Sequence, residues 1–291
     1  MFDVVMPTHN NLHLTMQAVD SLYKHTMNPF HLIVVDDSTD LTPQYFSWLN
    51  KDNLTFIHSG EPYKCGNQFF NIAIKHMKHD YLATVMNSIK VEPEWDMVPM
   101  KVLTEDATVG GVGLKSLFPN GTIESAGITI NNYTPVDIGL HEPGHRRVAM
   151  YECPAVQWAF AIFRKVAIDG ILEENVYHGF VGWDDIDNCF VLKKNGWKIV
   201  YCGASAGYHE PRATRGSDTL VSHLKNQANA QNFYRRWGLW ELFRNNDKTT
   251  PDFYQLVPGK ETEIDRMAKE LQGNGFTPKP NRAMRRRGKH V

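Results

Sequence analysis

The chain has 291 residues, of which 42% are hydrophobic and 22% charged, an ordinary composition for a globular protein with a sizeable core. Its formal net charge of −1 excludes a global electrostatic attraction to nucleic acid or to a membrane. The apolar runs are far shorter than the roughly 20 residues that span a bilayer, so we expect any membrane association to be peripheral. The four cysteines have no paired short spacing, and no signal peptide is recognisable, which favours a cytoplasmic location.

Two short β-branched runs lie near the N-terminus, and each ends abruptly in polar residues. The first covers residues 3–10 (DVVMPTHN) and the second covers residues 31–40 (HLIVVDDSTD). The segment between them carries apolar residues at helical spacing, namely Leu12, Met16, Val19 and Tyr23. We expect Asn10 or Asn11 to cap this helix. Since strand-helix-strand crossovers are right-handed, the pattern predicts two parallel strands joined by a helix.

The polar ends of these two strands form the first candidate site. Parallel strands end at the same edge of a sheet, so we expect Thr8, His9 and Asn10 to face Asp36 and Asp37 across a crevice. A carboxylate in this position can accept hydrogen bonds from a ribose, and an adjacent ring can stack on a base. The strand ends therefore indicate a nucleotide site, although the Asp-Ser-Thr-Asp run is also typical of a solvated turn.

The rest of the chain continues the alternation of strands and helices. Strands are predicted at residues 54–58 and 81–86, with a helix at 71–78 between them, which completes a Rossmann-like half. From about residue 109 the pattern changes to short strands and glycine-containing turns, with an apolar run at 155–163. We expect this second half to carry the side of the protein that binds the acceptor.

The C-terminal part is predicted to be helical and then irregular. A helix at 187–194 ends at Asn195-Gly196, a strand follows at 198–202, and a long helical pattern covers 222–243. Residues 244–291 lose this regularity apart from a short amphipathic piece near 264–271. The Arg-rich stretch at 281–289 is expected to be a solvated, disordered terminus, the alternative being contact with phosphate-rich lipid or nucleic acid.

The order of these motifs resembles that of the inverting family 2 glycosyltransferases, whose fold is called GT-A. The segments that carry the resemblance are Pro7 to Asn10, Val34 to Asp40, Asn71 at the family's Ala-Arg-Asn segment, Trp183 to Asp187 at its Glu-Asp-hydrophobic-Asp motif, Gly196 to Val200, and Tyr208-His209. The resemblance extends over roughly residues 1 to 240. Residues 113–115 and 120–127 are similar to the rhamnosyltransferase-like branch.

This resemblance implies an α/β GT-A domain at 1–243 around a mixed central sheet, with a nucleotide-binding half at 1–105 and an acceptor half at 106–243. Residues 244–291 would then form a C-terminal helical extension with a basic tail. The implied enzyme transfers a sugar from a UDP- or dTDP-linked donor, with inversion, to a hydroxyl group. Its acceptor would be a glycan, a lipid-linked molecule or a protein, and its role would lie in glycan biosynthesis.

The resemblance also assigns site residues. Those implied to bind the nucleotide are Pro7, Thr8, His9, Asn10, Asp36, Asp37, Asn71 and Asn87. Asp185 holds the position of the family's catalytic base, with Asp184 beside it, and Trp183 is a candidate to stack on the acceptor sugar.

The chain departs from the family where an Asp-x-Asp motif normally holds the ribose and a divalent metal. Here the residues are Asn87, Ser88 and Ile89, and isoleucine cannot bind a hard cation. A requirement for Mn²⁺ or Mg²⁺ is therefore in doubt, although His209 matches a family contact to the metal or the diphosphate. Our hypothesis is that Lys90, with Arg212 or Arg215, neutralises the diphosphate instead.

Two other functions remain open from the sequence. The first is a non-catalytic module that binds nucleotide-sugars or glycans, suggested by Ile89. The second is a glycosyltransferase that acts on modified nucleic acid, suggested by the Arg-rich end and weakened by the near-neutral net charge. The segment 131–150 is expected to be a loop over the site that influences acceptor choice.

Two further motifs are similar to known sites in letters only. His141 to His145 (HEPGH) has the spelling of a zinc-protease motif, but Pro143 and Gly144 predict a loop, whereas that motif requires a helix. Residues 113–116 (GLKS) end like a phosphate-binding loop without its upstream glycines. We expect neither to carry the chemistry that its letters suggest.

Overall fold

The computed structural model describes residues 1–63, 65–131, 134–211, 219–246, 266, 268 and 269. The described chain divides into two compact units, one made of residues 1–174 and 182–216 and the other of residues 175–181 and 217–291. The first unit contains most of the two halves expected from the sequence. The second contains the helical pattern of residues 222–243, which we had expected within the catalytic domain.

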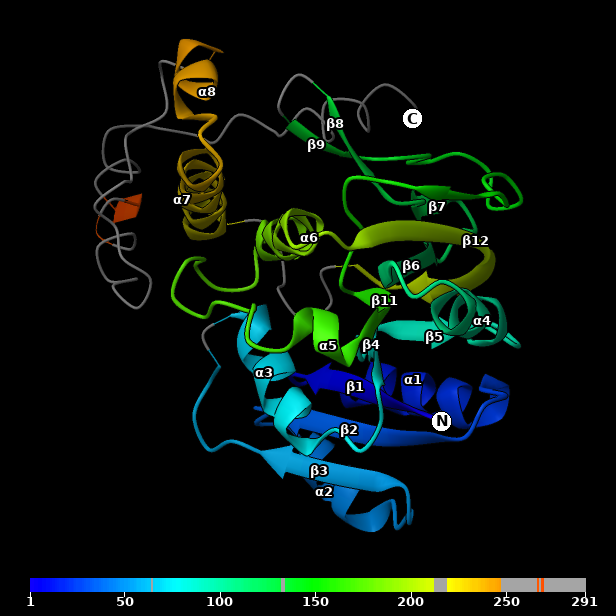
Figure 1. The fold of residues 1–291 in the computed structure, drawn as a ribbon. Helices are drawn as coiled ribbons and strands as arrows, with labels where there is room; N and C mark the ends of the chain where they lie inside the picture. The colour runs from blue at the N-terminus through cyan, green and yellow to red at the C-terminus, as the bar shows by residue number, and fades with distance from the viewer. Residues whose placement is uncertain (64, 132–133, 212–218, 247–265, 267, 270–291) are drawn as a thin grey trace. The chain divides into compact units, whose positions relative to one another are not determined.

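A mixed sheet forms the centre of the first unit (Figure 1). Its main strand order is β10-β12-β6-β11-β4-β1-β2-β3, with β5 paired to β12 and β7 to β6. The strands are β1 (Phe2–Thr8), β2 (Phe30–Asp36), β3 (Leu54–His58), β4 (Tyr81–Val85), β5 (Ile89–Val91), β6 (Val109–Leu117), β7 (Ile123–Ser125), β10 (Met150–Glu152), β11 (Phe160–Arg164) and β12 (Lys198–His209). A separate pair is formed by β8 (Ile128–Asn131) and β9 (Thr134–Asp137).

The N-terminal part of this sheet is parallel, as the crossover pattern predicted. Strand β1 pairs in parallel with both β2 and β4, and β2 pairs in parallel with β3. All seven residues of β1 are buried, because helices and loops cover both faces of a parallel sheet. Strand β11 then runs antiparallel to β4 and β6, which makes the sheet mixed. The mixed α/β architecture expected from the sequence is confirmed.

The helices of the first unit are α1 (Leu12–His25), α2 (Thr42–Trp48), α3 (Gly66–His76), α4 (Met97–Glu105), α5 (Lys165–Ile168) and α6 (Asp184–Lys194). Helix α1 buries a different stripe from the one predicted. Thr15, Ala18 and Leu22 are buried with Val19, whereas Met16 is 45% exposed. The small side chains of Thr15 and Ala18 allow the helix to approach the sheet closely, so a stripe chosen by hydrophobicity alone is rotated from the real one.

Helix α6 begins three residues before the predicted start at residue 187. Its first turn contains Asp184, Asp185 and Asp187, and carboxylates are favourable there because the amino end of a helix carries a partial positive charge. The predicted end at Asn195-Gly196 is close to the observed one, since α6 ends at Lys194 and Gly196 has a φ of 89°.

Two strands also differ from their predicted bounds. Strand β12 continues beyond Cys202 to His209, across a register shift between Cys202 and Ala206 in its pairing with β6. In the apolar run at 155–163, only the part from Phe160 onward joins a strand. A bulge thus lets β12 continue, and its far end carries a candidate site residue.

The second unit contains α7 (Leu220–Arg236) and α8 (Trp240–Asn246), where one helix was predicted at 222–243. The helix is interrupted at Gly238, which has a φ of 69°, and the Leu239 backbone N–H donates to the Tyr234 carbonyl at 2.7 Å. Leu220, Leu224 and Ala228 of α7 pack with Ala268. Within the described residues, no helix combines the length and apolarity needed to cross a membrane. The Arg-rich stretch at 281–289 lies outside the described residues.

Candidate active site

The carboxyl ends of β1 and β2 lie side by side, with Thr8 paired to Asp36 in register. Asp36 is fully buried, and its Oδ1 accepts hydrogen bonds from the hydroxyls of Thr8 and Ser38, each at 2.6 Å. Its Oδ2 lies 2.6 Å from Nδ1 of His58 on β3. Both oxygens are therefore engaged inside the protein, and Asp36 ties together the ends of three neighbouring strands.

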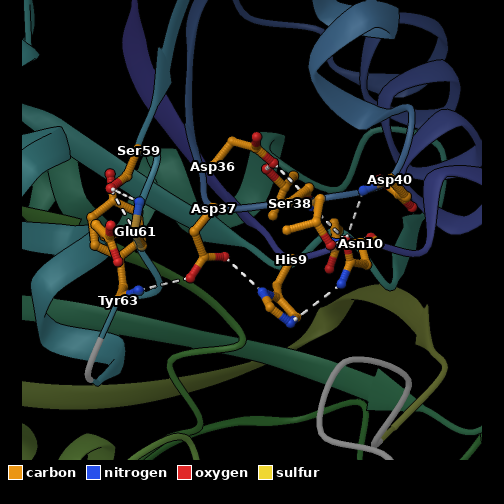
Figure 2. Close-up of polar contacts among 12 residues, drawn as sticks. His9, Asn10, Asp36, Asp37, Ser38, Asp40, Ser59, Glu61 and Tyr63 are labelled. Atoms are coloured by element: carbon orange, nitrogen blue, oxygen red, sulfur yellow. Dashed lines mark hydrogen bonds and ion pairs between the residues drawn. The ribbon is translucent and has the colours of Figure 1, made fainter.

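Asp37 and His9 form the more accessible part of this cluster (Figure 2). Nδ1 of His9 lies 2.8 Å from Oδ1 of Asp37, and the Tyr63 backbone N–H donates to Oδ2 of Asp37 at 2.8 Å. The His9 side chain is 37% exposed, whereas Asp37 is buried. A buried carboxylate thus orients an imidazole ring that solvent, and a ligand, can reach.

Asn10 shapes the loop that follows β1. Its φ is 56°, and its side-chain oxygen accepts hydrogen bonds from the backbone N–H groups of Thr39 at 2.8 Å and Asp40 at 3.1 Å. The predicted capping of α1 by Asn10 or Asn11 is not observed, because neither side chain makes a capping hydrogen bond. The left-handed backbone turns Asn10 toward the β2 loop instead.

Asp40 takes the capping role that the sequence reasoning gave to the asparagines. Its two carboxylate oxygens accept from the backbone N–H of Leu12, at 3.1 Å, and of Thr42, at 2.9 Å. Partial burial would raise the pKa of Asp40, but these hydrogen bonds outweigh it and lower that pKa. One carboxylate therefore satisfies the first turns of both α1 and α2. The Asp-Leu-Thr-Pro spelling of residues 40–43 was the available signal.

Asn87 and Pro7 lie at the same edge of the sheet. The Asn87 amide donates to the Asn10 carbonyl at 3.2 Å and lies 3.0 Å from the Thr15 hydroxyl, and the residue is only 3% exposed. Pro7 is buried in β1 opposite Val35. Six of the eight predicted nucleotide-binding residues belong to one hydrogen-bonded network that includes Ser38, namely Thr8, His9, Asn10, Asp36, Asp37 and Asn87.

Asn71 makes its described contacts elsewhere. Its side-chain amide donates to the Leu172 carbonyl and to Oε1 of Glu174, both at 2.8 Å. Asn67, one turn earlier on α3, donates to the Glu173 carbonyl at 2.9 Å. These two asparagines hold the segment 172–174 against α3, so the printed contacts of Asn71 do not join those of the strand-end cluster.

Asp184 and Asp185 open α6 after a strained turn. Gly182 has a φ of 93° and Trp183 a φ of 85°, and Trp183 is the residue from which α6 starts. A side chain at Gly66, the first residue of α3, would come within 2.8 Å of the Asp184 carboxylate. The absence of a side chain at Gly66 therefore makes room for Asp184 at the amino end of α3, where a negative charge is favourable.

Asp185 lies in an electrostatic environment that disfavours its ionised form. Burial and the nearby carboxylates of Asp184 and Asp137 raise the pKa of Asp185, although the Ile186 backbone N–H donates to its Oδ1 at 3.0 Å. Burial also raises the pKa of Asp184. An ionised carboxylate held in this way is a stronger base than one in water, which suits proton abstraction near neutral pH.

Two further carboxylates contribute to this environment, and the sequence reasoning gave them no role. Burial and the charge of Glu124 raise the pKa of Asp137 to about 6, although Gln157 donates to its Oδ1 at 3.0 Å. Oε2 of Glu124, on β7, lies 2.6 Å from Nδ1 of His209. Glu124 falls in a segment that carried the family resemblance, whereas Asp137 lacked a motif. Its distance in sequence from residue 185 concealed the interaction.

His209 and Lys90 are close in register but face differently. His209 ends β12 opposite Ile89, and Tyr208 lies opposite Lys90. Because successive side chains of a strand alternate, His209 and Lys90 extend from opposite faces of the sheet. Lys90 is exposed, whereas the His209 side chain is only 14% exposed and is held by Glu124. Arg212 and Arg215 lie outside the described residues.

The position of the family's metal-binding motif does not fit a hard divalent cation. Ile89 is fully buried in the hydrophobic core, and the Asn87 amide faces the α1 side. Among the residues that the structure describes, no three histidine, cysteine or acidic side chains group as metal ligands. Glu124 and His209 are already paired with each other, so we derive no catalytic step through a metal.

Neither the HEPGH segment nor the GLKS segment forms the site that its sequence motif suggests. His141 to His145 lies in turns rather than a helix. Residues 113–116 lie within β6, and a side chain at Gly113 would approach Val156 to 2.4 Å. The glycine at position 113 therefore allows close packing and does not cradle a phosphate.

Comparison with protein families and sequence relatives supports the nucleotide half most directly. The family model described as Glycosyl transferase family 2 matches residues 3–95. An uncharacterised protein, y4gI of Sinorhizobium fredii, is 26% identical over 253 residues, covering 81% of this chain and 27% of that protein. The O-antigen biosynthesis protein RfbC of Myxococcus xanthus is 23% identical over 238 residues, covering 75% of this chain and 18% of its own. The chain thus spans about a quarter or less of these relatives.

Solved structures that share the fold of this chain include complexes with UDP and with UDP-GlcNAc. A crystal structure of GalNAc-T7 with UDP, GalNAc and Mn²⁺ has a TM-score of 0.65 and 14% identity, covering 94% of this chain and 55% of that one. Staphylococcus aureus TarS 1-349 in complex with UDP-GlcNAc has a TM-score of 0.54 and 16% identity, covering 91% and 78%. At these identities the likeness shows the fold. The chain therefore has a GT-A fold, and its residues 3–95 match the model of glycosyl transferase family 2.

Proposed function

We propose that this protein transfers a sugar from a UDP- or dTDP-linked donor to an acceptor hydroxyl, with inversion at the anomeric carbon. The observation that carries the proposal is the hydrogen-bonded cluster at the carboxyl ends of β1, β2 and β4, within the family-matched residues. Ligands of α/β sheets bind outside this edge. The UDP in the GalNAc-T7 structure and the UDP-GlcNAc in the TarS structure support a nucleotide-sugar donor.

In this proposal, the donor contacts fall to the accessible members of the cluster. The His9 ring, oriented by Asp37, stacks on the base, because it is the most exposed side chain of the pair. Asp36 has both oxygens engaged by Thr8, Ser38 and His58, so its part is to hold the strand ends in place. The site is thereby organised before the donor binds, which lowers the entropic cost of binding.

Asp185 is the proposed catalytic base. It takes the proton from the acceptor hydroxyl as that oxygen forms its bond to the anomeric carbon. The bond from that carbon to the diphosphate breaks on the opposite face, and the nucleoside diphosphate leaves with the bonding electrons. The raised pKa of Asp185 supports this role, and Asp184, whose carboxylate lies beside Gly66, is its neighbour.

The departing diphosphate needs positive charge, which we assign to His209 and Arg212. Lys90 extends from the opposite face of the sheet and is therefore left out of this assignment. Glu124 keeps Nδ1 of His209 engaged, so the other ring nitrogen is the one that can face a ligand. Because Mn²⁺ accompanies UDP in the GalNAc-T7 structure, metal dependence is tested directly by comparing turnover in Mn²⁺, in Mg²⁺ and in EDTA.

The first experiment measures binding and slow hydrolysis of a panel of nucleotide-sugars by the full chain. Thermal stabilisation together with released UDP or dTDP supports a transferase and identifies its donor. Full turnover in EDTA supports charge neutralisation by protein side chains, whereas strict dependence on Mn²⁺ or Mg²⁺ contradicts it. No stabilisation by any donor contradicts the nucleotide site itself.

One observation favours a second candidate, a module that binds nucleotide-sugars or glycans without turning them over. Ile89 fills the hydrophobic core at the position of the metal-binding aspartate, so the usual ligand is replaced by a packing residue. Donor binding without hydrolysis, and without transfer to any of a set of glycan, lipid-linked and protein acceptors, would favour this module. The name of the Myxococcus relative, an O-antigen biosynthesis protein, is our reason to test glycan acceptors first.

A further inference from the structure

A cavity lies in the first unit, apart from the strand-end cluster. It has a volume of about 520 Å³ and is lined, among others, by Glu92, Lys115, Leu117, His145 and Tyr208. In the parallel pairing of β6 and β12, Lys115 lies opposite Ala206 and Leu117 lies opposite Tyr208. These side chains therefore share one face of the two strands. We call this space the Lys115 cavity.

One wall of the Lys115 cavity is formed by the segment 141–145, whose sequence HEPGH is similar to a zinc-protease motif. The backbone N–H of Gly144 donates to the Gly121 carbonyl at 3.0 Å, and that of His141 donates to the Ile123 carbonyl at 2.7 Å. The Arg147 guanidinium donates to both carboxylate oxygens of Glu142, at 2.5 and 3.0 Å. The segment is thus hydrogen-bonded to the turn after β6 and to β7, and an ion pair joins its own residues, so the cavity is a preformed feature of the fold.

Lys115 is the unusual residue of this cavity. It is only 4% exposed, and in the described part of the chain its ammonium makes one hydrogen bond, to the Gly144 carbonyl at 3.0 Å. An ammonium has three N–H donors, and leaving them unused in a buried position costs free energy. Burial lowers the pKa of Lys115, and the nearby charge of Glu92 opposes that shift. The lysine can therefore donate to a ligand that enters the cavity.

The charges around the cavity favour one chemical class of ligand. A simple anion would be attracted by Lys115 and repelled by Glu92, and a cation would meet the reverse. A neutral hydroxyl group suits both, because its oxygen can accept from the ammonium while its O–H donates to the carboxylate. Leu117 and the ring of Tyr208 add apolar surface for the face of a sugar ring.

We propose that the Lys115 cavity binds a neutral sugar unit, with its hydroxyls bridging Lys115 and Glu92. The cavity is distinct from the donor side, because Tyr208 lines it whereas the next residue, His209, extends from the other face of β12. Assigning the bound sugar to the acceptor glycan rests on the proposed function, but the binding itself does not. The segment 143–145 then contributes to acceptor recognition, as expected for residues 131–150.

The test uses the full chain and neutral probes, namely the methyl glycosides of glucose, galactose, mannose, rhamnose and N-acetylglucosamine. Saturation-transfer NMR detects binding, and calorimetry measures it with UDP present and absent. We expect at least one glycoside to bind with a millimolar Kd that UDP leaves unchanged. Lys115→Met, which keeps the aliphatic stem, and Glu92→Gln should each weaken binding at least tenfold.

Lys101→Met on α4 is the matched control, because its side chain is 69% exposed and lies outside the residues that line the cavity. It should leave the Kd unchanged. Thermal unfolding verifies that each variant is folded, and Glu92→Gln, at a partly exposed position, keeps the test decisive if Lys115→Met does not fold.

Three results would overturn the proposal: no glycoside binds, both cavity variants bind as the wild type does, or acetate and sulfate bind more tightly than every glycoside. The last would make the cavity an anion site. Donor hydrolysis is measured on the same samples. If the wild-type chain binds no glycoside but hydrolyses a donor, only the cavity is rejected, whereas glycoside binding without any donor binding rejects only the proposed transfer.

Discussion

The carboxylates at the ends of β1 and β2 and those around Asp185 solve the problem of buried charge in different ways. Asp36 and Asp37 together accept from two hydroxyls, one backbone N–H and two imidazole rings. Asp185 and Asp137 lie in each other's electrostatic field, and burial raises the pKa of both. The first group holds the strand ends in place. The carboxylates of the second group have raised pKa values, so in their ionised form they are stronger bases.

The comparison also predicts which property a substitution in each region lowers, stability or turnover. Hydrogen bonds that hold a scaffold contribute mainly to stability, so their removal should be seen in unfolding experiments. A carboxylate with a raised pKa contributes to reactivity, so its removal should be seen in turnover. The predictions below test this division, beginning with the largest effect.

Replacing Asp185 by Asn should lower transfer by about 10²–10⁴-fold, the range that a general base contributes. Donor binding should change less than about twofold, because the donor contacts lie in the strand-end cluster. Steady-state kinetics and calorimetry with the identified donor measure both quantities. Asp169→Asn, at an exposed residue after α5, is the matched control. Transfer within a few-fold of wild type would remove Asp185 from its proposed role.

Replacing Asp36 by Asn should lower the free energy of unfolding by about 2–3 kcal/mol. One carboxylate oxygen becomes an NH₂ group, which would then face the donors that this oxygen accepted from. Asp36 is fully buried with three partners, so the mismatch cannot be relieved by water. Urea unfolding monitored by circular dichroism measures the change. A loss below about 0.5 kcal/mol would show that this carboxylate is not the scaffold we infer.

Asp137 should make stability depend on pH. Its pKa of about 6 in the folded protein exceeds the ordinary value of about 3.9, so the folded state favours the protonated form. This contribution is fully present below about pH 4 and is lost as the pH rises through about 6. Asn resembles the protonated carboxyl.

Asp137→Asn should therefore be more favourable, relative to wild type, at pH 7.5 than at pH 4, by up to about 2–3 kcal/mol. Unfolding curves for both proteins at the two pH values measure the difference. A difference that is equal at both values, or that has the opposite sign, would contradict the raised pKa.

The smallest effect is expected for His9. His9→Ala should weaken donor binding by about 2- to 10-fold, because an aromatic stack contributes about 0.5–1.5 kcal/mol. Stability should change little, since the ring is 37% exposed. Calorimetry with UDP and dTDP measures binding. His13→Ala, at an exposed histidine of α1, serves as the control. Equal binding by His9→Ala and wild type would exclude stacking on this ring.

Much of the fold could be predicted because local patterns carried it. The parallel β1-α1-β2 unit follows from two β-branched runs and their spacing, and the cluster of Thr8, His9, Asp36 and Asp37 follows from strands that end at one edge. The predictions failed where a residue had a local alternative to the expected conformation. Asn10 turned toward the β2 loop and left the capping of α1 to Asp40, and Gly238 divided one expected helix into two.

The sequence by itself determined the mixed α/β fold, the order of the motifs and the loop structure of the HEPGH segment, because periodicity, β-branching and proline act over a few residues. Only the tertiary structure decided that Asp137 and Glu124 influence Asp185 and His209, and that Lys115 lines a cavity with Glu92. Those relations join residues far apart in the chain, and burial and Coulomb interactions depend on distance in space rather than along the sequence.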